Sequence, residues 1–315
     1  MRRWRRLVSA GVLCVVLAGC SAPFVLADSA LGQGVSVSTR VVMGRTYLAV
    51  RAETVHSGLP LLVVLHGRGM DVRNAALQTG FLRYAEQGIA DIVYPAGIGQ
   101  SWNAGSGCCG VAARQHVDDV AFVTAVVADA AHEFGTNPRH VYLVGYSNGG
   151  RLAFHVACVS PAPFAAFATY GAAAPTTCTN RAAAGLSALI TAGTGDRILG
   201  HGAQVVAEAA GAWRTLDSCP PTSSVRRSGP AVVTTWPGCA GGASVQSIVY
   251  LGATHAWPAS LSALIWDFLS GQVRRATAGR ARRPGGGAVR AAPSAGRAPP
   301  ARRRATAARA VRTRR

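Results

Sequence analysis

Residues 145–150 read Gly-Tyr-Ser-Asn-Gly-Gly, and this stretch decides the fold. The apolar run 141–144 before it is typical of a buried strand, and 151–157 after it has the composition of a helix. A Gly-x-Ser-x-Gly motif between a strand and a helix is typical of a nucleophile elbow, a sharp turn that lifts the serine clear of the sheet. The pattern predicts a nucleophilic Ser147; the alternative is an ordinary strand–loop–helix connection.

Short apolar runs alternate with helical patterns through most of the chain. Such alternation favours an α/β fold, with a mostly parallel sheet covered by helices on both faces. At 315 residues there is room for one such domain, which we expect at 36–272. Strands are predicted at 35–42, 46–50, 61–65, 92–94, 141–144, 167–170, 186–190, 232–236 and 245–251, and helices at 74–86, 117–134, 151–157, 203–213 and 259–269.

The net charge of +19 could indicate a nucleic-acid partner, but most of the excess positive charge lies at the two ends of the chain. All 32 basic residues are arginine, and 18 of them lie before residue 7 or after residue 273. The 14 arginines between these ends nearly balance the 13 acidic residues, which all lie there. A basic groove on the domain is therefore not expected, and neither is nucleic-acid binding.

The N-terminal segment has the pattern of an export signal. Residues 1–19 combine a basic start with an apolar run of about a dozen residues, which is too short for an ordinary membrane span. The sequence Leu-Ala-Gly-Cys at its end resembles a bacterial lipobox, so we predict a lipoprotein signal peptide, lipidation of Cys20 and a linker at 20–35. The alternative is a plain secretory signal cleaved near Ala27.

Two further expectations follow for the ends of the chain. The protein is predicted to be exported and held at the outer face of the cell membrane by its lipid, or otherwise secreted. Residues 273–315 are rich in Arg, Ala, Pro and Gly and have no apolar period, so we expect them to be disordered.

A serine nucleophile needs a base, and the base needs an orienting carboxylate. In hydrolases with this elbow, an acidic residue and then a histidine follow the serine along the chain. Asp196 comes directly after the strand 186–190, at the sheet edge where parallel strands end, and is the predicted acid. Glu208 lies within a helix and Asp217 beside a cysteine, so both are expected on the surface.

Three histidines follow the serine, and His255 has the position expected of the base. It lies just past the strand 245–251, whereas His155 lies two turns along the helix behind the elbow and is interpreted as a packing residue. His201 follows Asp196 in the same loop and is the rival base. The predicted triad is therefore Ser147, Asp196 and His255.

Other residues near the motifs have weaker signals. The backbone amides of Asn148 and Arg68 are the predicted oxyanion donors, and His66 is expected to shape the oxyanion loop and to contact substrate. Trp102 and Trp257 adjoin motif loops and are predicted to line the substrate site, with core packing as the alternative. The acidic pair 118–119 opens a helix, which favours N-capping over catalysis.

Export implies an oxidising compartment, and the six cysteines of the domain are an even number. Cys219 and Cys239 flank a short strand and are predicted to pair. One of Cys108 and Cys109 is expected to reach Cys158, with Cys178 taking the remaining partner; the alternatives are a bridge between the two adjacent cysteines or free thiols. The spacing of cysteine and histidine does not indicate a metal site.

Five motifs occur in an order that resembles one enzyme family. They are Leu-His-Gly at 65–67, Ser-Trp-Asn-Ala-Gly at 101–105 followed by Cys-Cys-Gly at 108–110, Val-Asp-Asp-Val at 117–120, the elbow at 145–150, and His-Ala-Trp-Pro at 255–258. Together they resemble the polyhydroxybutyrate depolymerase / feruloyl and acetylxylan esterase family, particularly its LpqC-type lipoprotein members. The resemblance implies an α/β-hydrolase fold, the triad named above and no cofactor.

These observations predict a secreted serine esterase that hydrolyses carboxylic esters through an acyl-enzyme. The expected partner is an ester of short-chain, feruloyl, acetyl or hydroxyalkanoate type, polymeric substrates included, together with the membrane that holds the lipid of Cys20. One alternative is an acyltransferase on the same scaffold. Another is a lipoprotein without catalytic activity that binds the cell envelope.

Overall fold

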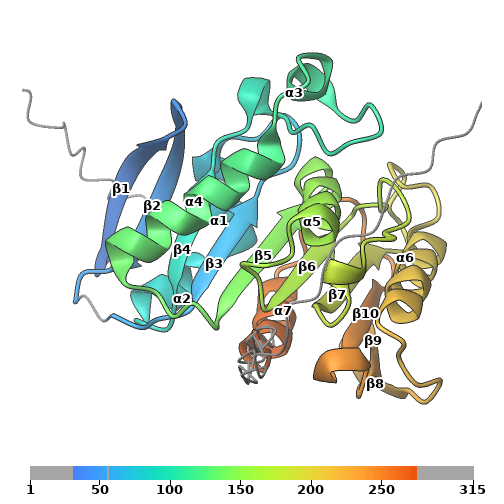
Figure 1. Ribbon diagram of the computed structural model, residues 1–315. Helices are drawn as coiled ribbons and strands as arrows, with labels where there is room; N and C mark the ends of the chain where they lie inside the picture. Colours follow the sequence, from blue (N-terminus) through green and yellow to red (C-terminus); the bar gives the residue numbers. More distant parts are fainter. Residues whose placement is uncertain (1–30, 55–56, 275–315) are drawn as a thin grey trace, which may run out of the picture. The chain divides into compact units, whose positions relative to one another are not determined.

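The computed structural model describes residues 31–54 and 57–274 (Figure 1). The predicted signal peptide, Cys20 and residues 275–315 of the predicted tail lie outside these described residues. The predicted linker overlaps the domain at its end, because the Leu31 side chain is buried in the core. Within the described residues no helix has both the length and the apolar character that crossing a membrane requires.

One sheet of ten strands forms the centre of the domain. From one edge to the other the strands are β1 (Val35–Val42), β2 (Arg45–Ala52), β4 (Asp91–Pro95), β3 (Leu61–Leu65), β5 (Val141–Tyr146), β6 (Ala166–Tyr170), β7 (Ser187–Gly193), β10 (Val245–Tyr250), β9 (Ala231–Trp236) and β8 (Ser224–Ser228). The six strands from β4 to β10 run parallel, and an antiparallel hairpin extends the sheet at each side. The predicted mostly parallel sheet is confirmed.

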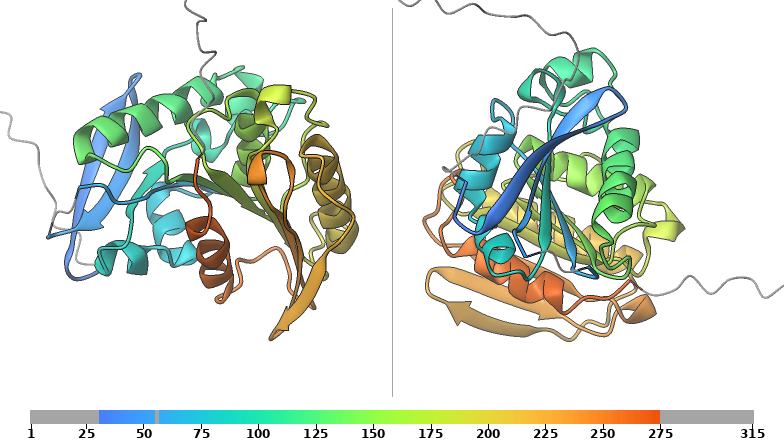
Figure 2. Two further views of the ribbon diagram at one scale, coloured as in Figure 1. Left: turned by 60° about the horizontal axis from the view of Figure 1, so that its bottom comes forward. Right: turned by 90° about the vertical axis from the view of Figure 1, so that its left-hand side faces the viewer.

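Helices cover both faces of this sheet, as Figures 1 and 2 show. The helices are α1 (Val72–Thr79), α2 (Leu82–Glu86), α3 (Gly110–Arg114), α4 (Asp119–Phe134), α5 (Asn148–Val159), α6 (Gly202–Leu216) and α7 (Leu261–Ser270). The apolar sides of α4, α5 and α6 pack on one face, and those of α1, α2 and α7 pack on the other. Because helices cover both faces of the sheet, the side chains on both sides of each central strand are buried. This explains the unbroken apolar runs of these strands.

Two elements differ from the sequence-based prediction. The predicted helix 74–86 is two helices, because Gly80 adopts a left-handed conformation with φ of 65° and ends α1. Strand β8 was not predicted at all, since it is short and its residues are almost all exposed. Among the described strands it pairs with β9 alone, and residues on both of its faces are exposed, so no apolar alternation is needed.

The six cysteines of the domain form three disulfides, which is typical of an extracytoplasmic protein. Cys219 pairs with Cys239, as predicted, while Cys158 pairs with Cys178 and Cys108 with its neighbour Cys109. The predicted bond from Cys158 to Cys108 or Cys109 is wrong. Cys158 lies in the last turn of α5, about 16 Å along the helix axis from the elbow. The loop that carries the adjacent pair is bonded to the first residue of that helix through Trp102 and passes His155 at Gly105.

Asp217, which we expected on the surface, is fully buried at the C-terminal end of α6. Its Oδ1 accepts the backbone N–H of Gly185 at 2.9 Å, and its Oδ2 has no hydrogen-bond partner among the described residues. Burial raises the pKa of this carboxyl to about 7, against the Gly185 hydrogen bond, which lowers it. The C-terminal end of a helix also disfavours negative charge.

We predict that Asp217→Asn removes a pH dependence of stability. Because the folded-state pKa lies above the unfolded one, the folded state binds the proton more tightly, and stability falls as pH rises from about 4 to about 7. This group lowers the free energy of unfolding by up to about 4 kcal/mol over that window. Urea unfolding from pH 4 to 8 measures it, with Glu208→Gln on the exposed side of α6 as the control. Parallel pH profiles for wild type and Asp217→Asn would contradict the prediction.

Candidate active site

Ser147 lies on the turn between β5 and α5, with φ of 53° and ψ of −118°. Positive φ is uncommon for a residue with a side chain, and the surroundings hold it in place. The Ser147 N–H donates to the Tyr170 carbonyl on β6 at 2.8 Å. A Cβ on Gly149 would overlap the carbonyl oxygens of Leu65 and His66 at the end of β3. The glycine therefore lets α5 approach the neighbouring strand closely enough to form the sharp turn.

The His255 imidazole contacts both other members of the predicted triad. Its Nε2 lies 2.8 Å from Ser147 Oγ, and its Nδ1 lies 2.7 Å from Asp196 Oδ2. The three residues come from loops after three parallel strands, β5, β7 and β10, whose carboxyl ends meet at one edge of the sheet. Ser147 and Asp196 are 49 positions apart in the sequence, and Asp196 and His255 are 59 apart. The shared edge of the parallel strands explains why they come together.

The Asp196 carboxylate is buried and fully hydrogen-bonded. Its Oδ1 accepts the backbone N–H groups of Ile198 and Leu199, each at 3.0 Å, which leaves Oδ2 for the histidine. A carboxylate in this position selects the tautomer that carries its proton on Nδ1. Nε2 is then free to accept the hydroxyl proton of Ser147, the arrangement that general-base chemistry requires.

Two tyrosines that the sequence analysis did not identify hold the histidine loop. The Tyr146 hydroxyl donates to the His255 carbonyl at 2.6 Å, and the Tyr170 hydroxyl donates to the Thr254 carbonyl at 2.7 Å. Burial raises the pKa of both hydroxyls, and the nearby Asp196 charge adds to this, so they remain donors. Their signal in the sequence is their position: each is the last residue of a parallel strand, level with the triad.

The two predicted oxyanion donors belong to the first residue of α5 and to the loop after β3. In the described part of the chain, the backbone N–H groups of Asn148 and Arg68 donate to no protein acceptor. The Asn148 side chain is buried and bonds twice to the backbone of Trp102: its Oδ1 accepts the N–H at 2.8 Å, and its Nδ2 donates to the carbonyl at 3.0 Å. This pair of bonds fixes the first residue of α5.

The predicted substrate contacts of Trp102, His66 and Trp257 are wrong, because all three side chains are buried. The Trp102 indole N–H donates to the His66 carbonyl at 2.8 Å, and the two rings lie 4.7 Å apart. His66 itself bonds to the Gly67 carbonyl and accepts the Gly97 N–H, so it holds the loop after β3, and its role in an oxyanion site stays a prediction. The Trp257 indole N–H donates to the Ser262 hydroxyl, and its ring packs against Tyr146 and Tyr170.

The remaining candidates lie away from the triad. His201 is exposed as the residue before α6, and His155 is half-buried next to Gly105. Among the described residues, no group of three or more His, Cys, Asp or Glu side chains is placed to hold a metal ion.

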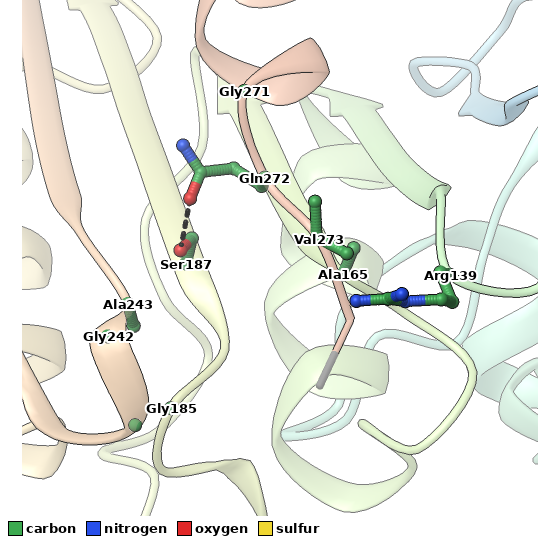
Figure 3. A pocket seen from close by; sticks show the side chains of 10 residues that line it. Arg139, Ala165, Gly185, Ser187, Gly242, Ala243, Gly271, Gln272 and Val273 are labelled. Carbon is green, nitrogen blue, oxygen red and sulfur yellow. Dashed lines mark hydrogen bonds between the residues drawn. The ribbon is translucent and has the colours of Figure 1, made fainter. Parts of the chain in front are cut away.

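A cavity of about 310 Å³ lies at the amino ends of the parallel strands, where β7 begins, whereas the triad lies at their carboxyl ends (Figure 3). The Ser187 hydroxyl donates to the Gln272 side chain at 2.8 Å within it, and the backbone of Ser244 donates to the same hydroxyl. These polar groups bond to one another. The cavity is lined by none of the three triad residues.

Solved structures share this architecture. The acetyl xylan esterase from Aspergillus awamori superposes with a TM-score of 0.61 at 15% identity, over 75% of this chain and 99% of that one. The LpqC poly(3-hydroxybutyrate) depolymerase from Bordetella parapertussis gives a TM-score of 0.50 at 18% identity, over 77% of this chain and 92% of that one. The chain has the α/β-hydrolase fold. The resemblance drawn from the sequence motifs is therefore confirmed at the level of the fold.

Similarity in sequence is more limited, and no protein-family model matches the chain. NocK of Nocardia uniformis subsp. tsuyamanensis, which is named as an esterase, is 30% identical over 141 residues, 43% of this chain and 40% of that one. The bifunctional acetylxylan esterase/xylanase XynS20E of Neocallimastix patriciarum is 25% identical over 225 residues, 67% of this chain and 31% of that one. The chain thus spans less than half of the length of either relative.

We predict that Gly149→Ala destabilises this domain by about 1–3 kcal/mol, because the new methyl group would overlap the backbone at the end of β3. Gly211→Ala in α6 is the control, since a Cβ there meets nothing within 4 Å. Alanine at that position is expected to stabilise the helix by roughly 0.5–1 kcal/mol. Chemical denaturation measures both changes, and a Gly149→Ala variant as stable as wild type would contradict the close approach.

Proposed function

We propose that the protein is a serine esterase that hydrolyses carboxylic esters with Ser147 as nucleophile, His255 as base and Asp196 as orienting acid. The observation that carries the proposal is the imidazole of His255, which lies within hydrogen-bond distance of both partners at once. A serine, a histidine and a buried carboxylate in this chain of contacts are the requirements of nucleophilic acyl transfer.

In the proposed acylation step, Ser147 Oγ attacks the ester carbonyl carbon while Nε2 of His255 takes the hydroxyl proton. The carbonyl oxygen becomes an oxyanion, and the backbone N–H groups of Asn148 and Arg68 are available to donate to it. When the tetrahedral intermediate collapses, the carbon–oxygen bond to the alcohol breaks and His255 passes its proton to the leaving alkoxide.

In the proposed deacylation step, a water molecule replaces the alcohol. His255 takes a proton from the water, the hydroxide attacks the acyl carbon, and the bond to Ser147 Oγ breaks as the proton returns to the serine. The carboxylate of Asp196 stabilises the imidazolium that forms in each half-reaction. Its two bonds from the backbone of 198 and 199 keep Oδ2 directed at the histidine.

For the substrate, we propose an ester with a short acyl group, acetylated xylan being the first candidate. Two of the similar proteins, from Aspergillus awamori and Neocallimastix patriciarum, are named as acetylxylan esterases. Feruloyl and hydroxyalkanoate esters are the other members of the predicted class. Initial rates on acetylated xylan, p-nitrophenyl acetate, methyl ferulate and hydroxybutyrate oligomers separate the three classes.

We also propose that the chain is exported and anchored to the outer face of the cell membrane through a lipid on Cys20. Its support is the lipobox pattern before Cys20 together with the three disulfides of the domain, which form in oxidising compartments.

Ser147→Ala is expected to abolish labelling by a fluorophosphonate probe and to lower kcat by several orders of magnitude, since the nucleophile is removed. Asp196→Asn and His255→Ala should each reduce turnover nearly as far while the circular dichroism spectrum stays unchanged. His201→Ala is the matched control, because that histidine is exposed outside the triad. Labelling that persists in Ser147→Ala would exclude this nucleophile.

Cys20→Ser is expected to leave export intact and to move the protein from the membrane fraction to the soluble fraction, because the residue that would carry the lipid is lost. Fractionation and immunoblotting of the native host measure the distribution. A membrane fraction equal to that of wild type would contradict the anchor.

A further inference from the structure

The two adjacent aspartates at the start of α4, Asp118 and Asp119, have different hydrogen-bond partners. Asp118 is exposed, and its carboxylate accepts the Ala121 N–H at 2.9 Å, which makes it the N-cap that the sequence predicts. The prediction is wrong for Asp119, whose side chain is completely buried and turned toward the active-site edge of the sheet. Neither the N-cap nor the proposed triad accounts for this second carboxylate.

Asp119 holds one particular peptide group. Its Oδ2 accepts the backbone N–H of Asn103 at 2.7 Å, and its Oδ1 forms an ion pair with Arg45 at 2.8 Å. Arg45 is itself confined, because its guanidinium donates to the Ala96 carbonyl and lies 3.7 Å from the centre of the Phe122 ring. Burial raises the pKa of Asp119, whereas Asn103 and Arg45 act in the opposite direction.

The same peptide group contacts the elbow from its other side. The N–H of Asn103 and the carbonyl of Trp102 belong to one planar peptide, which points its two polar ends in opposite directions. Asp119 binds the N–H end, and Nδ2 of Asn148 donates to the carbonyl end at 3.0 Å. One rigid peptide thus joins the buried carboxylate to the residue whose backbone N–H is the proposed oxyanion donor.

We propose that Asp119 is a positioning residue that sets the place of the Asn148 oxyanion donor through the Trp102–Asn103 peptide. The inference rests on the proposed esterase function. Compared with apolar residues of similar size, a buried ion pair adds little net stability, so a geometric effect on the donor is the testable role. An oxyanion donor works only within a narrow range of distances from the developing charge.

The test compares two double variants that both remove the buried charges. Arg45→Met/Asp119→Asn keeps an oxygen that can accept the Asn103 N–H, whereas Arg45→Met/Asp119→Leu has none. Asp118→Asn, which keeps the cap and removes one charge at the same helix end, is the control. We expect kcat on p-nitrophenyl acetate to be about tenfold lower in the Leu variant than in the Asn variant, with KM within about twofold.

A spectroscopic readout separates positioning from a general loss of structure. A trifluoromethyl ketone is labelled with ¹³C at its carbonyl. Ser147 Oγ should add to that carbon while the π bond of the carbonyl opens and the hydroxyl proton passes to Nε2 of His255, giving a hemiketal whose oxygen occupies the oxyanion position. Well-placed donors stabilise the ionised form, so the ¹³C titration should show a higher hemiketal pKa in the Leu variant than in the Asn variant, Asp118→Asn or wild type.

Equal kcat values and equal hemiketal pKa values for the two double variants would overturn the proposal. If the Leu variant does not fold, the single variant Asp119→Asn replaces it. An amide accepts more weakly than a carboxylate, so its hemiketal pKa must then exceed that of Asp118→Asn, and equality overturns the proposal as well. A wild-type protein that neither hydrolyses esters nor forms the hemiketal contradicts the esterase function itself and removes this inference with it.

Discussion

The backbone of Ser147 imposes the tightest constraint on the domain. With φ of 53° and ψ of −118°, the residue occupies a conformation that a free chain with a side chain rarely adopts. The neighbouring strands must hold it there, through the bond from its N–H to Tyr170 and the close contact of Gly149 with the end of β3. The turn therefore depends on β3, β5 and β6 being in register, and so on the central sheet as a whole.

Two groups of hydrogen bonds hold the loops around that turn. On one side, hydroxyls of Tyr146 and Tyr170 at the ends of neighbouring strands bind consecutive carbonyls of the loop that carries His255. On the other side, Trp102 links the elbow to the oxyanion loop, because its backbone binds Asn148 and its indole binds the His66 carbonyl. The loop that carries His255 and the first residue of α5 are thereby held by different sets of contacts.

The sequence was sufficient to predict much of the fold and the residues that converge at the elbow. Asp196 and His255 were predictable because parallel strands end at one edge, so a polar residue directly after such a strand reaches that edge. Trp102 was not, since an aromatic residue in a motif loop has the same pattern whether it faces a substrate or the core. Likewise, adjacent acidic residues at a helix start do not reveal which of the two is the cap. The partner of Cys158 was not predictable from the order of the motifs, because Cys158 lies about 16 Å along α5 from the elbow.

Every disulfide in the described chain is local, with sequence separations of 1, 20 and 20. For the two bonds with separations of 20, each native partner is near its cysteine in the unfolded chain, where the entropic cost of closing a flexible loop is small. None of the bonds joins two strands of the sheet, so the order of the strands does not depend on oxidation. The two bonds with separations of 20 residues can therefore close on short segments of the chain, whatever the order in which the strands of the sheet assemble.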